Sequence, residues 1–215
     1  MIPARLGSQR LAKKNLQLFN GETLIKNAIN KAKSCTLFDE IWVNSEAEAI
    51  GEVAKQEHVN FHLRPASLST SSATSEDFVY EFLNHHECDF LIQLHSIAPL
   101  ISNDEIHRFT KHMMKNQCDV LLSVEQIQIE CLYDKLPINF NFNKKTNSQD
   151  LVPIERISWA ITGWRRSSYL DAYLNGKCAT YAGITDTFPI SKNANLVIKT
   201  MEDLLMTQSI FDAKK

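Results

Sequence analysis

The feature that most constrains this chain is a regular alternation of short apolar runs with longer segments of helical periodicity. Strand-like runs occupy residues 40–45, 59–63, 89–94 and 119–124. Helical patterns occupy residues 23–34, 46–56, 74–86, 103–116 and 201–211. The runs at 89–94 and 119–124 are almost continuously apolar, as buried parallel strands are. Strands that alternate with helices at this spacing predict an α/β fold with a mostly parallel sheet covered on both faces.

The alternation stops after Val124. Residues 137–150 are rich in Asn and Lys, and Phe140 and Phe142 alternate with Asn as in a ribbon with one apolar side. Strand-like character returns at residues 158–164. We therefore predict one domain over residues 1–215, with an excursion from the core at about 137–155.

Composition excludes several classes of protein. The 215 residues suit one domain, and a formal net charge of -2 argues against a general nucleic-acid binder. No apolar run approaches the roughly 18 residues of a membrane span, and no signal-peptide pattern is present. The cysteines are odd in number and scattered, which predicts reduced thiols in a cytoplasmic protein. They are Cys35, Cys88, Cys118, Cys131 and Cys178.

The opening stretch IPARLGSQRLAKKN, residues 2–15, places four basic side chains around a Gly7–Ser8 turn. In a doubly wound sheet, ligands bind at the carboxyl ends of the strands, where this loop would lie. Amide-lined turns with cationic side chains bind phosphate, so we predict a phosphate site here; a solvated basic loop is the alternative. Because only two residues precede Pro3, the first strand is either very short or lacks upstream residues.

This stretch resembles the loop of the CMP-sugar synthetases, approximately I-P-A-R-x-G-S-K-x-I-x-x-K-N. These cytidylyltransferases activate sialic acids and related acidic sugars. Further similar segments follow in order at residues 19–29, 37–55, 61–79, 98–106 and 149–161, so the resemblance covers nearly the whole chain. It implies a Rossmann-like nucleotide-binding domain that transfers CMP from CTP to the anomeric hydroxyl of an acidic sugar and releases pyrophosphate. It also implies Mg²⁺, mainly as Mg–CTP, and a homodimer formed through the excursion.

The resemblance assigns roles to residues that match the family pattern. Arg5 and Lys14 would be catalytic and hold the CTP phosphates. His95 stands where the family has a glutamine, and we expect it to contact the acceptor. The remaining nucleotide-binding residues would be Ala4, Gly7, Ser8, Asn15, Arg64 and Ser75. From the residues alone, Arg64 also fits a surface salt bridge, Ser75 a helix cap, and His95 a core histidine.

The chain departs from the family pattern at several positions. Gln9 stands in place of a loop lysine, His95 in place of a glutamine and Ile101 in place of an arginine. The late D-I-D segment, which holds the metal in the family, is replaced by residues 197–199, Val-Ile-Lys. We predict that the protein adds few direct ligands to the metal, and the sequence does not identify them. Glu202 and Asp203 fit helix-start acids, and the adjacent histidines at 85–86 point in different directions on a helix, which argues against a zinc site. Two other functions remain open, a non-catalytic relative that binds nucleotide or a partner and a nucleotidyltransferase with another base or sugar.

Overall fold

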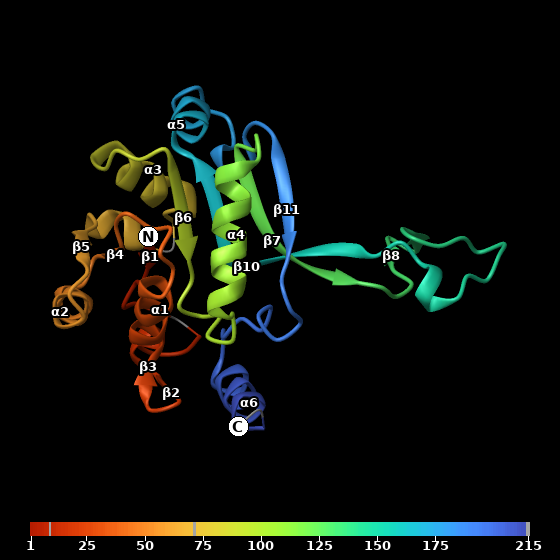
Figure 1. The fold of residues 1–215 in the computed structure, drawn as a ribbon, viewed down its shortest axis with the longest axis horizontal. Helices are drawn as coiled ribbons and strands as arrows, with labels where there is room; N and C mark the ends of the chain where they lie inside the picture. The colour runs from red at the N-terminus through yellow and green to blue at the C-terminus, as the bar shows by residue number, and fades with distance from the viewer. Residues whose placement is uncertain (9, 71, 214–215) are drawn as a thin grey trace.

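The computed structural model describes residues 1–8, 10–70 and 72–213 and has an α/β architecture (Figure 1). A three-stranded parallel sheet has the order β1 (Ile2–Pro3), β4 (Trp42–Ser45), β5 (Asn60–Leu63). A four-stranded sheet has the order β11 (Thr185–Pro189), β7 (Val120–Ile127), β10 (Ile154–Arg165), β6 (Phe90–Leu94). Two backbone hydrogen bonds of Met1 join β1 to β6: its nitrogen donates to Ile92 O at 2.8 Å and its carbonyl accepts from Leu94 N at 3.0 Å. The two sheets therefore form one continuous surface.

The prediction of a mostly parallel sheet is confirmed, with one exception. Strand β10 is antiparallel to both of its neighbours, β6 and β7, whereas β11 is parallel to β7. The sequence pattern indicated a strand at residues 158–164 but not its direction. A parallel return from β7 would need a crossover, usually a helix, and the chain has only an extended excursion there, so β10 comes back antiparallel.

Four of the predicted helices begin where the sequence indicates, because side chains satisfy the free N–H groups of their first turns. Thr23 caps α1 (Leu24–Lys33) by accepting a hydrogen bond from Lys26 N. Reciprocal capping boxes start the helices α3 (Ser75–His85), α4 (Asn103–Lys115) and α6 (Met201–Asp212). The cap of α3 is Thr74, so the alternative role of Ser75 as a helix cap is wrong.

An arm formed by residues 128–153 leaves the body between β7 and β10 and projects away from it (Figure 1). It holds a small hairpin of β8 (Leu132–Tyr133) and β9 (Leu136–Pro137) and a short 3-10 turn, Ser148–Asp150. The alternating ribbon expected at Phe140 and Phe142 does not form. That segment is irregular, and the two rings meet edge to face at 5.5 Å.

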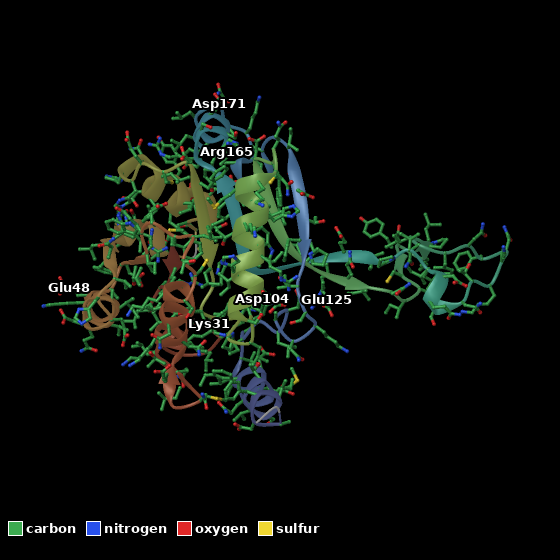
Figure 2. The ribbon with its side chains drawn as sticks, in the orientation of Figure 1. Lys31, Glu48, Asp104, Glu125, Arg165 and Asp171 are labelled. Atoms are coloured by element: carbon green, nitrogen blue, oxygen red, sulfur yellow. The ribbon has the colours of Figure 1, made fainter. Side chains whose placement is uncertain are left out.

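Side chains stand out from the arm into open space, and Glu125 marks its base (Figure 2). Ion pairs of Glu125 with Arg156 and of Glu130 with Lys145 hold the arm together. Large apolar side chains are nevertheless exposed on the arm and at its base. They are Ile129, Leu132, Tyr133, Leu136, Ile138, Phe142, Val152 and Ile157.

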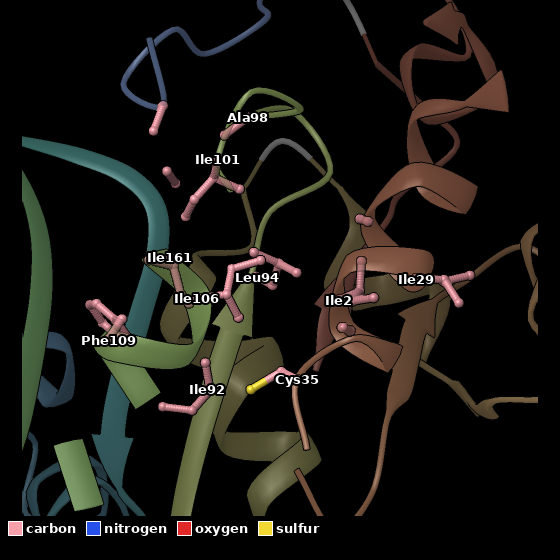
Figure 3. Packing of buried hydrophobic residues seen from close by; sticks show 14 of the residues in the cluster. Ile2, Ile29, Cys35, Ile92, Leu94, Ala98, Ile101, Ile106, Phe109 and Ile161 are labelled. Atoms are coloured by element: carbon pink, nitrogen blue, oxygen red, sulfur yellow. The ribbon is translucent and has the colours of Figure 1, made fainter. Parts of the chain in front are cut away.

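The sheet is covered on both faces, as predicted. Helices α1, α2 (Glu48–Gln56) and α4 pack on one face, where Ile2, Ile29, Ile92 and Phe109 belong to one buried cluster (Figure 3). Helices α3 and α5 (Arg166–Leu174) cover the other face with a second cluster. Both faces bury apolar side chains, which explains the continuous apolar runs of the central strands.

The sequence did not predict helix α5 or the edge strand β11, nor several two-residue strands and short 3-10 turns. Helix α5 buries only Tyr169 and Ala172, so its sequence carries little helical periodicity. The opening loop is followed by an antiparallel pair of two-residue strands, β2 (Leu18–Phe19) and β3 (Glu22–Thr23). Among the described residues, no helix is long and apolar enough to cross a membrane.

Candidate functional site

The opening loop starts at the centre of the sheet. Ala4, fully buried, donates its N–H to Asn44 O at 2.9 Å, and the exposed residue Arg5 follows directly. Strand β1 lies between β4 and β6, so the chain leaves the sheet where the strand order reverses. This is the position at which doubly wound sheets bind ligands. The predicted phosphate loop therefore lies at the expected place in the fold.

The turn itself is partly committed to contacts within the protein. Gly7 is exposed and has open space around it, whereas Ser8 donates its N–H to Leu6 O at 2.9 Å. The N–H of Leu6 donates to Glu46 Oε1 at 2.8 Å. The backbone near Gly7 is thus accessible, while its neighbours stabilise the shape of the loop. Gln9, which replaces the family lysine, lies outside the described residues.

Four cations gather beside this loop: Arg5, Arg10, Lys14 and Lys199, which we call the cationic cluster. Lys14 is partly buried, and its Nζ donates to Ile198 O at 3.2 Å. Burial lowers the pKa of Lys14, and the positive charges of Arg10, Arg5 and Lys199 lower it further. Asp203 offsets part of this charge, but four cations gathered beside one carboxylate leave a positive excess that favours a bound polyanion.

Asn15 connects the loops that follow β1 and β6. Its Nδ2 donates to Arg5 O at 2.8 Å, and its Oδ1 accepts from Ser96 Oγ at 2.6 Å. Asn15 is 6% exposed, so its side chain is committed to this bridge. In this conformation Asn15 positions the backbone of Arg5.

Arg64, which follows β5, is only 3% exposed, so the interpretation as a surface salt bridge is wrong. Its Nη2 pairs with Glu46 Oε2 at 3.0 Å, and its guanidinium lies 4.8 Å from the ring centroid of Phe78. Glu46 also accepts from Leu6 N–H and from Ser69 Oγ. Burial raises the pKa of Glu46, but these hydrogen bonds outweigh it, and the pKa falls below its usual value. The Arg64–Glu46 pair thus ties the opening loop to the segment before α3, a link that sequence analysis missed.

A cavity of about 230 Å³ opens at the carboxyl end of β6, and we call it the β10 cavity. It is lined by Ser75, Val79, Gln93, His95, Trp159, Trp164, Tyr169 and Thr180. Ser75 and His95, two of the predicted site residues, therefore line the same cavity. Burial lowers the pKa of His95 to about 4, and the charge of Lys14 adds to the effect. His95 is therefore neutral near pH 7 and hydrogen-bonds Gln93 Oε1 through Nε2 at 3.1 Å.

The wall of the β10 cavity depends on an irregularity in strand β10 that the local sequence pattern does not predict. The register of β10 against β7 shifts between Ile157 and Thr162, and Trp159 has a φ of 59°. A bulge of this kind re-aims side chains beside functional sites. It brings Trp159 into the cavity, whereas Trp164 is a core residue with 3% exposure that also reaches the lining.

Comparison with known proteins assigns the family. Residues 1–156 match the sequence model described as Cytidylyltransferase. The chain belongs to this family.

Individual relatives agree with the assignment. An N-acylneuraminate cytidylyltransferase of Streptococcus agalactiae serotype III (strain NEM316) is 26% identical over 215 aligned residues, covering 95% of this chain and 51% of that protein. A pseudaminic acid cytidylyltransferase of Campylobacter jejuni (serotype O:2, strain ATCC 700819 / NCTC 11168) is 29% identical over 134 residues, covering 60% of this chain and 58% of that protein. The chain thus spans about half the length of the N-acylneuraminate cytidylyltransferase.

Solved structures match the fold over its whole length. A CMP:2-keto-3-deoxy-manno-octonic acid synthetase, solved in complex with CTP, has a TM-score of 0.77 and 16% sequence identity. The match covers 100% of this chain and 98% of that one. This chain therefore shares the Rossmann-like α/β fold of that synthetase along its full length.

Residues 197–199 depart from the family pattern that the opening loop matches. Val197 and Lys199 flank Ile198, which is fully buried between the opening loop and the loop after β6. Asp203 accepts hydrogen bonds from Lys199 N and Thr200 N at 2.8 Å and completes the cap of α6, as predicted for a helix-start acid. Within the described part of the chain, no three His, Cys, Asp or Glu side chains form a group that could hold a metal ion. Mg²⁺ prefers oxygen ligands, and neither Val197 nor Lys199 supplies a carboxylate.

Proposed function

We propose that this cytidylyltransferase-family chain transfers CMP from CTP to the anomeric hydroxyl of an acidic, sialic-acid-like sugar. The carrying observation is that the cationic cluster and the β10 cavity meet at the carboxyl ends of β1 and β6. One half suits a triphosphate and the other a compact polar acceptor. In this step the sugar oxygen bonds to the α-phosphorus, the bond to the β-phosphate oxygen breaks, and pyrophosphate and a proton leave.

Charge and position supply the catalysis in this proposal. Phosphoryl transfer needs an in-line arrangement and neutralisation of negative charge more than it needs covalent help. Arg5 and Lys14 would contact the phosphates, and Asn15 would hold the backbone of Arg5 in place. Gly7 and Ser75 are exposed at the edge of the site, where the nucleotide would lie. Arg64 would shape the nucleotide pocket through Glu46, because its charge is already paired.

The acceptor would occupy the β10 cavity. Its volume of about 230 Å³ is several times the ~30 Å³ share of one water molecule, so a sugar ring has room. Gln93, 2% exposed, has a side-chain nitrogen with no partner among the described residues, and it lines this cavity. A buried amide nitrogen of this kind favours a ligand oxygen. Neutral His95 would supply a second hydrogen-bonding group beside it.

Cytidylyltransferases of this kind generally use CTP with a divalent metal. Because Val197 and Lys199 supply no carboxylate, we propose that Mg²⁺ enters as the Mg–CTP complex, as part of the substrate. The metal would neutralise phosphate charge there. We also propose a cytoplasmic location, which the five free cysteines support.

Two assays test the activity. Isothermal titration with CTP, ATP, GTP and UTP should show preference for CTP. Pyrophosphate release should then be measured with N-acylneuraminate, pseudaminic acid and 2-keto-3-deoxy-manno-octonic acid as acceptors. Preference for another nucleotide would contradict the cytidylyl assignment, and CTP binding without release on any acceptor would indicate a non-catalytic relative.

We further propose a homodimer in which the arm contributes to the contact. Its exposed apolar side chains include Tyr133 at 78% and Leu136 at 67%, and such a patch is typical of an interaction surface. Light scattering at micromolar concentration should give twice the chain mass, and Tyr133→Asp with Leu136→Asp should give the monomer. Leu174→Asp is the matched control, because Leu174 is 70% exposed but lies on α5, away from the arm. A wild-type monomer would contradict this part of the proposal.

A further inference from the structure

Lys199 occupies a fixed position at the mouth of the site. The residue before it, Ile198, is fully buried and donates its N–H to Ile97 O at 2.8 Å. Its carbonyl accepts from Lys14 Nζ at 3.2 Å. The backbone at Lys199 is therefore held between the loops that follow β1 and β6, while its side chain is exposed.

The charges around Lys199 are unbalanced. Its positive charge is near enough to that of Lys14 to lower the pKa of the Lys14 amine, as do Arg5 and Arg10. Asp203 acts on Lys14 in the opposite direction, and the charge of Lys199 in turn helps lower the pKa of Asp203. The Oδ2 of Asp203 already caps α6, so this single carboxylate balances only part of the positive charge of the cationic cluster. No carboxylate among the described residues pairs with the Lys199 side chain. A local positive excess on a chain of net charge -2 marks a place for a polyanion.

Lys199 also lies on one particular side of the reacting centre. It does not line the β10 cavity, where the acceptor would bind. In an in-line displacement the leaving group departs opposite the attacking oxygen. The pyrophosphate portion of CTP would therefore lie away from the cavity, beside Lys14 and Lys199.

We propose that Lys199 binds the β- and γ-phosphates of the nucleotide and, with Lys14, supplies charge that a protein-bound divalent cation would otherwise supply. This inference rests on the proposed function. An ammonium group offers three hydrogen-bond donors and one positive charge, whereas Mg²⁺ needs oxygen ligands that residues 197 and 199 do not provide. The protein should therefore bind CTP in the absence of divalent metal.

The test is isothermal titration of the wild type, Lys199→Gln and Lys199→Arg with CTP, CMP and inorganic tripolyphosphate, in EDTA. Lys192→Gln is the matched control, because Lys192 is an exposed lysine in the same connection from β11 to α6. The Kd of CTP should rise about tenfold in Lys199→Gln, that of CMP should hardly change, and Lys199→Arg should keep most of the affinity. Unfolding curves should coincide for all variants, because both side chains are exposed.

The outcomes separate this inference from the proposed function. Equal effects on the Kd of CTP and of CMP, or no effect on either, would overturn the role of Lys199 in phosphate binding and leave the proposed function standing. Wild-type binding that appears only with Mg²⁺ would overturn it as well. Lys199-dependent binding of tripolyphosphate without any binding of CTP would support the phosphate contact and refute the cytidylyl function. Binding of neither ligand, with or without Mg²⁺, would refute both.

Discussion

The loops that follow β1 and β6 lie side by side, joined by the Asn15–Ser96 hydrogen bond, yet they are built in opposite ways. The loop after β1 is largely exposed and carries Arg5, Arg10 and Lys14. The loop after β6 is mostly buried, with Ser96 at 2% and Ala98 at 1% exposure, and its one titratable group, His95, stays neutral.

The difference indicates two modes of recognition within one site. Exposed cations attract a polyanion through charge, which salt screens and which tolerates some variation in ligand shape. A buried, neutral lining selects by volume and hydrogen bonding, where a change of one methylene group is felt. Nucleotide binding should therefore respond to ionic strength, and acceptor binding to side-chain size.

The largest expected effect is on the free energy of unfolding, and it comes from Glu46, which supports the cationic loop after β1. Glu46→Ala leaves the Arg64 guanidinium buried without a carboxylate and frees the N–H of Leu6. Breaking a buried ion pair in this way costs about 3–5 kcal/mol, which urea unfolding should report. The control is Glu48→Ala, an exposed acid at the start of α2 (Figure 2), for which less than about 1 kcal/mol is expected. A small loss for Glu46→Ala would mean that the opening loop is simply solvated.

The second effect is on the nucleotide itself. Lys14→Ala and Arg5→Ala should each remove a charge-assisted hydrogen bond to a CTP phosphate. Such a bond is worth roughly 1.5–3 kcal/mol, so the Kd of CTP should rise tenfold or more. Wild-type affinity should fall as salt rises, and it should fall less steeply in the variants. Lys55→Ala, an exposed lysine of α2, serves as the control. Unchanged affinity in both loop variants would refute the phosphate site.

Local chemistry made much of this site predictable. The caps at Thr23 and Thr74, and the apolar strands, depend on residues close in sequence. Strands β1 and β5 run parallel to β4, which lies between them, and β6 joins β1 on its other side. The carboxyl ends of β1, β5 and β6 therefore bring Arg5, Arg64 and His95 to one edge of the sheet. Family resemblance supplied the roles, and parallel topology explains why these residues meet.

The remainder depends on contacts between distant segments. In the sequence, Glu46 is indistinguishable from an ordinary helix-start acid, and only its partner Arg64 reveals the buried pair. Trp159 enters the β10 cavity through a register shift in β10, which has no local signal. The direction of β10 likewise follows from how the arm returns to the sheet. These features arise from packing, so periodicity could not predict them.

The third effect tests the neutral half. With its pKa lowered to about 4, His95 is neutral in the folded chain while its unfolded form takes up a proton near pH 6.5. Stability should therefore be complete above about pH 7 and should be lost progressively as pH falls toward 4. His95→Gln should reduce this acid loss by on the order of 1–3 kcal/mol and alter the KM of the acceptor, with CTP affinity unchanged. The control is His107→Gln on α4, which should leave the loss of stability in acid and the KM of the acceptor unchanged. If His95→Gln lost as much stability in acid as the wild type, the cavity would tolerate a charged imidazole.

The smallest expected effect concerns the metal. It tests whether carboxylates at residues 197 and 199 let Mg²⁺ take the place of the Lys199 ammonium group. The double change Val197→Asp with Lys199→Asp places two carboxylates on either side of Ile198, whose backbone is fixed by Lys14 and Ile97. Mg²⁺ prefers such oxygen ligands, so the Mg²⁺ concentration for half-maximal rate should fall about several-fold, while metal-free CTP binding weakens. The measurement is the initial rate of pyrophosphate release against Mg²⁺ concentration, with the acceptor saturating. The control pair Val197→Asn with Lys199→Asn removes the ammonium without adding charge and should not show the gain. We expect slow turnover in the unmodified chain; brisk turnover at micromolar Mg²⁺ would place metal ligands elsewhere and make the assignment of residues 197–199 wrong.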